Sequence, residues 1–110
     1  MIINSLFVYG SLQPGAANEN YLNHIKDTWK QGYVLGNLIS KGWGNKIGFP
    51  VIQLDNKGEK VGGWLLESDN LQNNLNMLDD FEGKEYKRST TNVYLNDGLK
   101  QLAYIYELNE

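Results

Sequence analysis

The chain of 110 residues carries a formal charge of only −3 and contains no cysteine. Because it has no local cluster of Lys or Arg, it lacks the basic footprint typical of nucleic-acid-binding proteins, and disulfide or thiolate chemistry is excluded. Three Trp, seven Tyr and three Phe among 41% apolar residues indicate a folded globule, which we expect to be a single domain over residues 1–110. No segment resembles a signal peptide or approaches the roughly 18 apolar residues of a membrane-spanning helix, so we expect a cytoplasmic protein.

The first half of the chain is predicted to be mainly β structure broken by turn-forming residues. The elements expected there are, in chain order, a strand over Ser5–Tyr9, a helix N-cap at Asn18, a short helix carrying Tyr21, Leu22 and Ile25, a strand over Trp29–Ser40 and an extended segment over Phe49–Leu54. Glycines within the second strand indicate a bulge or a close backbone approach. The intervening segment KGWGNKIG is predicted to be a loop.

The second half is predicted to contain one helix followed by two strands. The strand KVGGWLLE leads into the helix, and β structure resumes after Gly83 and runs towards the turn Asn96-Asp97-Gly98. A closing strand, QLAYIYEL, pairs back after that turn. Strands therefore outnumber helices, which favours an α+β fold built from a mixed sheet or small β-barrel with two or more flanking helices.

The helix in the second half raises a question about one acidic side chain. Leu71, Leu75 and Leu78 recur at the spacing of an amphipathic helix with one apolar face. At about 100° per residue, Glu82 falls within about 20° of Leu71 and continues this stripe, whereas Asp80 points about 180° away. Because a carboxylate in an apolar setting is costly, it usually has either a structural partner or a chemical task.

Two interpretations of Glu82 are compatible with the local sequence. The helix C-terminus and an apolar setting would both raise the pKa of its carboxyl group towards the range useful for a general base. Alternatively, Glu82 forms a salt bridge with Arg88, or the helix end frays and leaves the side chain in water. The local sequence alone does not separate these alternatives.

The turn after the first strand, YGSLQPG, is a second candidate. A glycine directly after a buried strand lets successive main-chain N–H groups point into a cleft, where they can hold a carboxylate or an oxyanion. The alternative is a plain tight turn. Ser11 is a weak nucleophile candidate, because the segment is neither a nucleophile elbow nor a nucleotide-binding loop.

Other polar and aromatic residues carry weaker signals. His24 is the single histidine, and without cysteine partners it does not make a usual zinc site, so we expect no metal. Tyr86, Tyr104 and Tyr106 are typical of a core or a cleft lining, although their hydroxyl groups could orient a polar substrate.

In this order the segments resemble the gamma-glutamylcyclotransferase-like family, and specifically its gamma-glutamylamine cyclotransferase branch. The resemblance spans nearly the whole chain and rests on YGSL, then V-x-G, then LD-x-x-E-G-x-x-Y-x-R. It implies a mixed β-barrel with flanking helices and an enzyme that cyclises a gamma-glutamyl group to 5-oxoproline without a cofactor. Glu82 occupies the family's catalytic position.

The resemblance also implies a substrate site. Main-chain N–H groups of the YGSL loop are expected to hold the α-carboxylate or the carbonyl oxygen that becomes negative. The expected substrate-binding residues are Tyr9, Gly10, Ser11, Leu12, Tyr86, Arg88 and Tyr106. The expected partner is a small gamma-glutamyl compound.

Two rival functions follow from the same residues. One is an enzyme that acts on a different gamma-glutamyl carrier, such as a peptide or a biosynthetic intermediate. The other is a non-catalytic module that binds a small metabolite or a protein. Glu82 favours an enzyme, because a pure binder of anionic substrates gains nothing from a buried negative charge.

Overall fold

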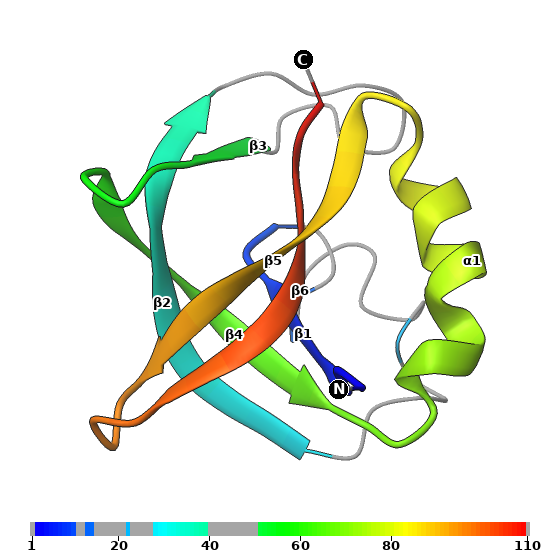
Figure 1. The fold of residues 1–110 in the computed structure, drawn as a ribbon, viewed down its shortest axis with the longest axis horizontal. Coiled ribbons are helices and arrows are strands. Elements are labelled where there is room, and N and C mark those ends of the chain that lie inside the picture. Colours follow the sequence, from blue (N-terminus) through cyan, green and yellow to red (C-terminus); the bar gives the residue numbers. More distant parts are fainter. Residues whose placement is uncertain (1, 11–12, 15–21, 23–27, 40–50, 110) are drawn as a thin grey trace.

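The computed structural model describes residues 2–10, 13, 14, 22, 28–39 and 51–109. These residues form six strands and one helix (Figure 1). In chain order the elements are β1 (Ser5–Val8), β2 (Thr28–Ile39), β3 (Val51–Leu54), β4 (Glu59–Glu67), α1 (Leu71–Glu82), β5 (Tyr86–Leu95) and β6 (Lys100–Leu108).

Five of the six strands close into a barrel. The strand order is β3-β2-β4-β1-β6-β5, and a further pairing between β2 and β5 joins the sheet to itself. β1 and β6 are parallel, whereas the other pairs are antiparallel. β3 is an extra strand attached to β2, outside the closed ring. The mixed β-barrel predicted from the sequence is therefore confirmed.

Glycine lets β1 and β4 approach closely. A Cβ atom on Gly63 of β4 would collide with the carbonyl oxygen of Val8 and lie 2.7 Å from Cζ of Phe7, both in or at the end of β1. Only glycine fits without a shift of the neighbouring strand. The end of β1 is thereby held close to β4.

The buried apolar residues form two clusters that correspond to the two faces of the strands. One cluster contains Phe7 of β1, Leu65 of β4 and Ile105 of β6, whose side chains lie on the same face of the sheet. The other contains their sequence neighbours Leu6 and Leu66 and packs beneath α1. The helix therefore covers one side of the barrel, as Figure 1 shows.

The leucine stripe fixes α1 on the barrel. Leu71, Leu75 and Leu78 are all buried, as the helical spacing predicts. The helix ends at Gly83, which has φ 85° and ψ 178°, a conformation that is accessible to glycine and strained for other residues. The Gly83 N–H donates to the carbonyl oxygen of Asp79 at 3.0 Å, so the last turn is closed.

The remaining sequence predictions are only partly covered by the described residues. The strands expected near Ser5, Trp29 and Gln101 are confirmed to within one residue at each end. Of the expected short helix only Leu22 is described, and it is fully buried. The N-cap at Asn18, the loop KGWGNKIG and His24 lie outside the described residues. Within those residues, no helix has the length and apolar character needed to cross a membrane.

Candidate active site

Glu82 is the last residue of α1 and is partly shielded from water. Its oxygen Oε2 exposes less than 1 Å² to solvent, and the side chain as a whole is half-buried. By contrast, Asp80 on the other face of the helix is exposed. Because the helix continues through Glu82 and its last turn is closed by Gly83, the alternative of a frayed and fully wet end is wrong.

Arg88 forms its ion pair with Asp79 rather than with the glutamate that the sequence suggested. Its Nη1 atom lies 3.3 Å from Oδ2 of Asp79, and its guanidinium lies over the ring of Tyr104 at 5.2 Å. Arg88 also lies directly opposite Tyr106 in the pairing of β5 with β6. The guanidinium is therefore part of the contact between α1 and these two strands.

Tyr9 joins three strands through its hydroxyl group. The hydroxyl donates to the main-chain oxygen of Tyr106 in β6 at 2.6 Å and accepts a hydrogen bond from the main-chain N–H of Ile52 in β3 at 3.1 Å. Burial raises the pKa of Tyr9, and the charge of Glu82 adds to this shift, whereas the hydrogen bond from Ile52 opposes it. The start of the predicted substrate loop is thus fixed to the barrel.

Two further tyrosines lie within the electrostatic reach of Glu82. Burial raises the pKa of Tyr86 to about 12, with a smaller contribution from the charges of Glu82 and Glu85. Burial also raises the pKa of Tyr106, followed by the hydrogen bond that its hydroxyl donates to Oδ1 of Asp79 at 2.6 Å, and Glu82 again contributes. The negative charge of Glu82 therefore contributes to the raised pKa of all three tyrosines.

A hollow of about 510 Å³ opens at the C-terminal end of α1. Its lining residues are Asp79, Asp80, Gly83, Lys84, Tyr86, Arg88 and Tyr106. Three of the predicted substrate-binding residues, Tyr86, Arg88 and Tyr106, thus share one hollow, whereas Glu82 and Tyr9 are not among its lining residues. Two carboxylates and two cations line it, which suits a polar or zwitterionic group better than an apolar one.

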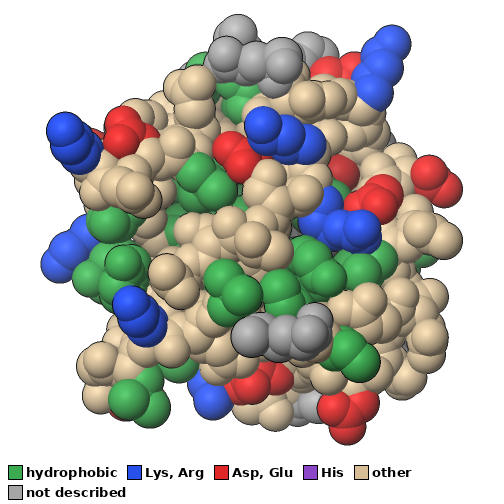
Figure 2. Space-filling model, in the orientation of Figure 1, with side chains coloured by type: hydrophobic (Ala, Val, Ile, Leu, Met, Phe, Trp, Pro, Cys, Tyr) green, Lys and Arg blue, Asp and Glu red, His purple; other side chains and the backbone are tan. Residues whose placement is uncertain are grey.

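The visible face of the molecule carries a mixed distribution of charge (Figure 2). Figure 2 shows acidic and basic side chains interspersed on the visible face, with hydrophobic side chains between them. No extended basic patch appears on this face of the described residues.

The predicted substrate loop is only partly described. Tyr9 and Gly10 follow β1 directly, whereas Ser11 and Leu12 lie outside the described residues. The Gln13 N–H donates to the carbonyl oxygen of Gly10 at 3.2 Å, so the chain turns at this point. The part of the chain that the structure describes contains no group of three His, Cys, Asp or Glu side chains that could hold a metal ion.

Sequence reasoning missed the part played by Asp79. Its carboxylate accepts from Tyr106 and pairs with Arg88, so it connects α1 to both β5 and β6. Asp79 lies one turn before Glu82, and Arg88 follows in the same segment, LDDFEGKEYKR. This closeness along the chain is the signal that could have indicated Arg88 as the partner of Asp79.

Comparison with known families identifies the fold. The sequence model of the family described as "Gamma-glutamyl cyclotransferase, AIG2-like" matches residues 6–110. The chain belongs to this family. The match includes β1, α1 and every strand of the barrel.

Solved structures agree with this assignment. YkqA from Bacillus subtilis is 27% identical with a TM-score of 0.75, and the match covers 98% of this chain but only 36% of YkqA. An AIG2-like protein from Mus musculus is 26% identical with a TM-score of 0.70, covering 97% of this chain and 78% of that one. A structure described as a gamma-glutamyl cyclotransferase, at 20% identity and a TM-score of 0.65, covers 96% of this chain and 66% of its own and supports the fold. A comparison with curated proteins found no match.

Proposed function

We propose that the protein is a gamma-glutamylcyclotransferase-type enzyme that converts a gamma-glutamyl amine or peptide to 5-oxoproline and a free amine. The observation that carries this proposal is the position of Glu82, a carboxylate with a shielded oxygen at the end of α1, directly before Gly83, which lines the hollow shared by Tyr86 and Arg88. Tyr9 begins the loop that we assign to the substrate. Membership of the family supports the same reaction class.

In the proposed reaction, Glu82 first acts as a general base. The α-amino group of a gamma-glutamyl compound is an ammonium ion at neutral pH, so it must lose a proton before its nitrogen can attack. The Glu82 carboxylate takes that proton, and the free amine attacks the side-chain carbonyl carbon of the same molecule. The new C–N bond closes a five-membered ring and places a negative charge on the carbonyl oxygen.

Glu82 then acts as a general acid. The carbonyl double bond re-forms, the bond from this carbon to the leaving nitrogen breaks, and the carboxyl group returns its proton to that nitrogen. The ring nitrogen also releases its second proton, which passes to the departed amine, so the products are 5-oxoproline and the protonated free amine. No net proton or electron is gained or lost, so the reaction as proposed requires no cofactor.

The protein's main contribution is then to hold the substrate in a folded conformation. Attack within one molecule avoids the entropic cost of bringing two reactants together. We assign Tyr9, Gly10, Ser11 and Leu12 to the carboxylate and carbonyl oxygen, and Tyr86 and Arg88 to the outer part of the substrate. We further propose that the enzyme acts on small soluble metabolites in the cytoplasm.

A substrate panel tests this proposal. Purified protein is incubated with gamma-glutamyl amines, gamma-glutamyl dipeptides and ε-linked glutamyl-lysine, and 5-oxoproline is measured by mass spectrometry, with the α-linked glutamyl dipeptides as a control. We expect product from at least one gamma-linked member and none from the α-linked compounds. Binding of a gamma-glutamyl compound without any 5-oxoproline would instead support a non-catalytic binding module.

A further inference from the structure

Tyr106 forms hydrogen bonds both to α1, through its side chain, and to Tyr9 after β1, through its main chain. Its side-chain hydroxyl donates to Oδ1 of Asp79 on α1, and its main-chain oxygen accepts from the hydroxyl of Tyr9, each at 2.6 Å. Asp79 lies three residues before Glu82 on the same helix. Tyr9 begins the loop after β1.

We propose that Tyr106 is a positioning residue that sets the separation between the Glu82 carboxylate and the loop that begins at Tyr9. This inference rests on the function proposed above. It gives Tyr106 a role that differs from direct contact with substrate, because its hydroxyl hydrogen is already donated to Asp79.

On the helix side, the bond to Asp79 controls the last turn of α1. Asp79 is also the residue whose carbonyl oxygen accepts the N–H of Gly83, so the turn that carries Glu82 begins at Asp79. Arg88 pairs with the second carboxylate oxygen of Asp79, which keeps Oδ1 directed at the tyrosine. Since α1 ends immediately after Glu82, no later helical turn restrains this side chain.

On the loop side, the hydrogen bond from Tyr9 is part of a partly buried network. Tyr106 is only 4% exposed, and the hydroxyl of Tyr9 also accepts the N–H of Ile52. A change in the side chain of Tyr106 leaves its main-chain oxygen in place. Replacement by Phe therefore releases the helix side while the loop side stays fixed.

This asymmetry predicts a specific kinetic effect. If the loop holds the substrate and Glu82 transfers the proton, loosening α1 moves the base but not the substrate. A misplacement of about 1 Å in a reacting group can cost on the order of 100-fold in rate. We expect Tyr106→Phe to lower kcat by roughly ten- to a hundredfold while KM changes by less than about threefold.

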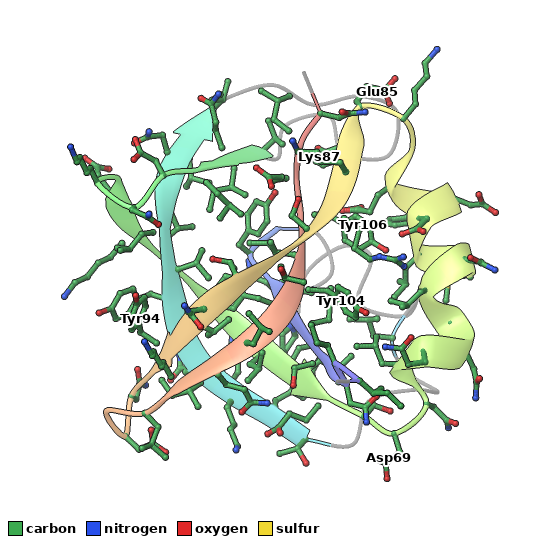
Figure 3. The ribbon with its side chains drawn as sticks, in the orientation of Figure 1. Asp69, Glu85, Lys87, Tyr94, Tyr104 and Tyr106 are labelled. Atoms are coloured by element: carbon green, nitrogen blue, oxygen red, sulfur yellow. The ribbon has the colours of Figure 1, made fainter. Side chains whose placement is uncertain are left out.

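Tyr104 supplies a matched control on the same strand. It also lies on the face of β6 beneath α1, and Figure 3 labels both tyrosines between the barrel and the helix. Its hydroxyl accepts a hydrogen bond from Nε2 of Gln72 at 3.3 Å, near the start of α1. Tyr104→Phe removes a strand-to-helix hydrogen bond far from Glu82, so we expect kcat and KM to stay within about twofold of the unmodified enzyme.

Two variants of Asp79 separate positioning from a general loss of stability. Asp79→Asn keeps a side-chain oxygen that can accept from Tyr106, whereas Asp79→Ala does not. We expect Asp79→Asn to retain most of kcat and Asp79→Ala to fall to the level of Tyr106→Phe. The double variant Tyr106→Phe/Asp79→Ala should be no slower than either single variant, because both remove the same bond.

The experiment combines kinetics of all five variants with crystal structures of the unmodified protein, Tyr106→Phe and Tyr104→Phe. We expect the separation between the Glu82 carboxylate and the Gly10 amide nitrogen to change only in Tyr106→Phe. An unchanged separation and an unchanged kcat in that variant would overturn the proposal, as would an equal loss in Tyr104→Phe. If the unmodified protein forms no 5-oxoproline, the proposed function fails, and the measured separation still decides whether Tyr106 has the positioning role.

Discussion

The guanidinium of Arg88 lies 3.3 Å from Oδ2 of Asp79, and this ion pair joins β5 to the last turn of α1. The side chains of the two residues are 30% and 40% exposed, respectively. The pair is therefore close to solvent, and water and salt weaken its attraction. Its main effect is on geometry, because it orients the carboxylate that accepts from Tyr106.

A double-mutant cycle tests the strength of this ion pair. With Asp79→Asn, Arg88→Gln and the double variant, we expect a coupling of about 0.2–1 kcal/mol in the free energy of unfolding. The coupling should decrease at high salt. Urea denaturation at low and high ionic strength measures it, and a coupling well above this range would mean that the pair is more strongly desolvated than its exposure indicates.

The proposed general base is tested by Glu82→Gln. We expect 5-oxoproline formation to fall by roughly 10²–10⁴-fold, because the amide cannot accept the substrate's proton. The melting temperature should change little, since Gln has the same shape. Glu59→Gln, an exposed change at the start of β4, is the matched control and should keep full activity. Full activity in Glu82→Gln would exclude the assigned role, and unfolding would indicate a structural one.

Substitution of two adjacent glycines of β4, Gly62 and Gly63, by Ala is expected to affect the free energy of unfolding differently. Gly63→Ala places a methyl group against the carbonyl of Val8 and the ring of Phe7, so we expect a loss of about 1–3 kcal/mol in the free energy of unfolding. Gly62 is exposed and a Cβ atom there would have no neighbour within 4 Å. Gly62→Ala should be neutral or stabilising by up to about 1 kcal/mol, through a less flexible unfolded chain. Chemical denaturation distinguishes the two, and equal effects would contradict the close approach of β1.

The buried tyrosines predict a loss of stability at high pH. The pKa of Tyr86 rises from 10.0 to about 12 on folding, so the unfolded chain releases this proton first. The stabilising contribution is complete below about pH 10 and is lost as the pH rises towards about 12. The pKa values of Tyr9 and Tyr106 are raised in the same direction, so they add to the slope.

Denaturation curves between neutral pH and about pH 12 measure this slope, and tyrosinate absorbance follows the ionisation itself. Tyr86→Phe should reduce the decline in stability and remove one late-ionising group. A stability that does not fall in this range would contradict the burial of these hydroxyls.

Local patterns in the sequence were sufficient to predict α1 and its C-terminal end. The three leucines give the buried face, and Gly83 gives the end, because its φ of 85° suits glycine alone among the residues nearby. The turn at Asn96-Asp97-Gly98 was also predictable, because these residue types favour a turn between two strands. In the structure Gly98 has φ 89°, which suits glycine. In each case the decisive residues lie close together along the chain.

Contacts between distant segments could not be predicted in this way. Tyr9 and Tyr106 are 97 residues apart, and their bond depends on the pairing of β1 with β6. Likewise, both Asp79 and Glu82 were available to Arg88, and the choice depends on how α1 is rotated over β5 and β6. The resemblance to a known family gave the barrel itself, which strand propensities alone left open.

The parallel pairing of β1 with β6 has a consequence for biosynthesis. β1 lies between β4 and β6, so the first strand to leave the ribosome keeps one unpaired edge until the last strand of the barrel has followed it. Pairings of such long sequence separation form slowly. A nascent chain that lacks β6 should therefore expose the edge of β1 to other unfolded chains, and the ring closes only after β6 has left the ribosome.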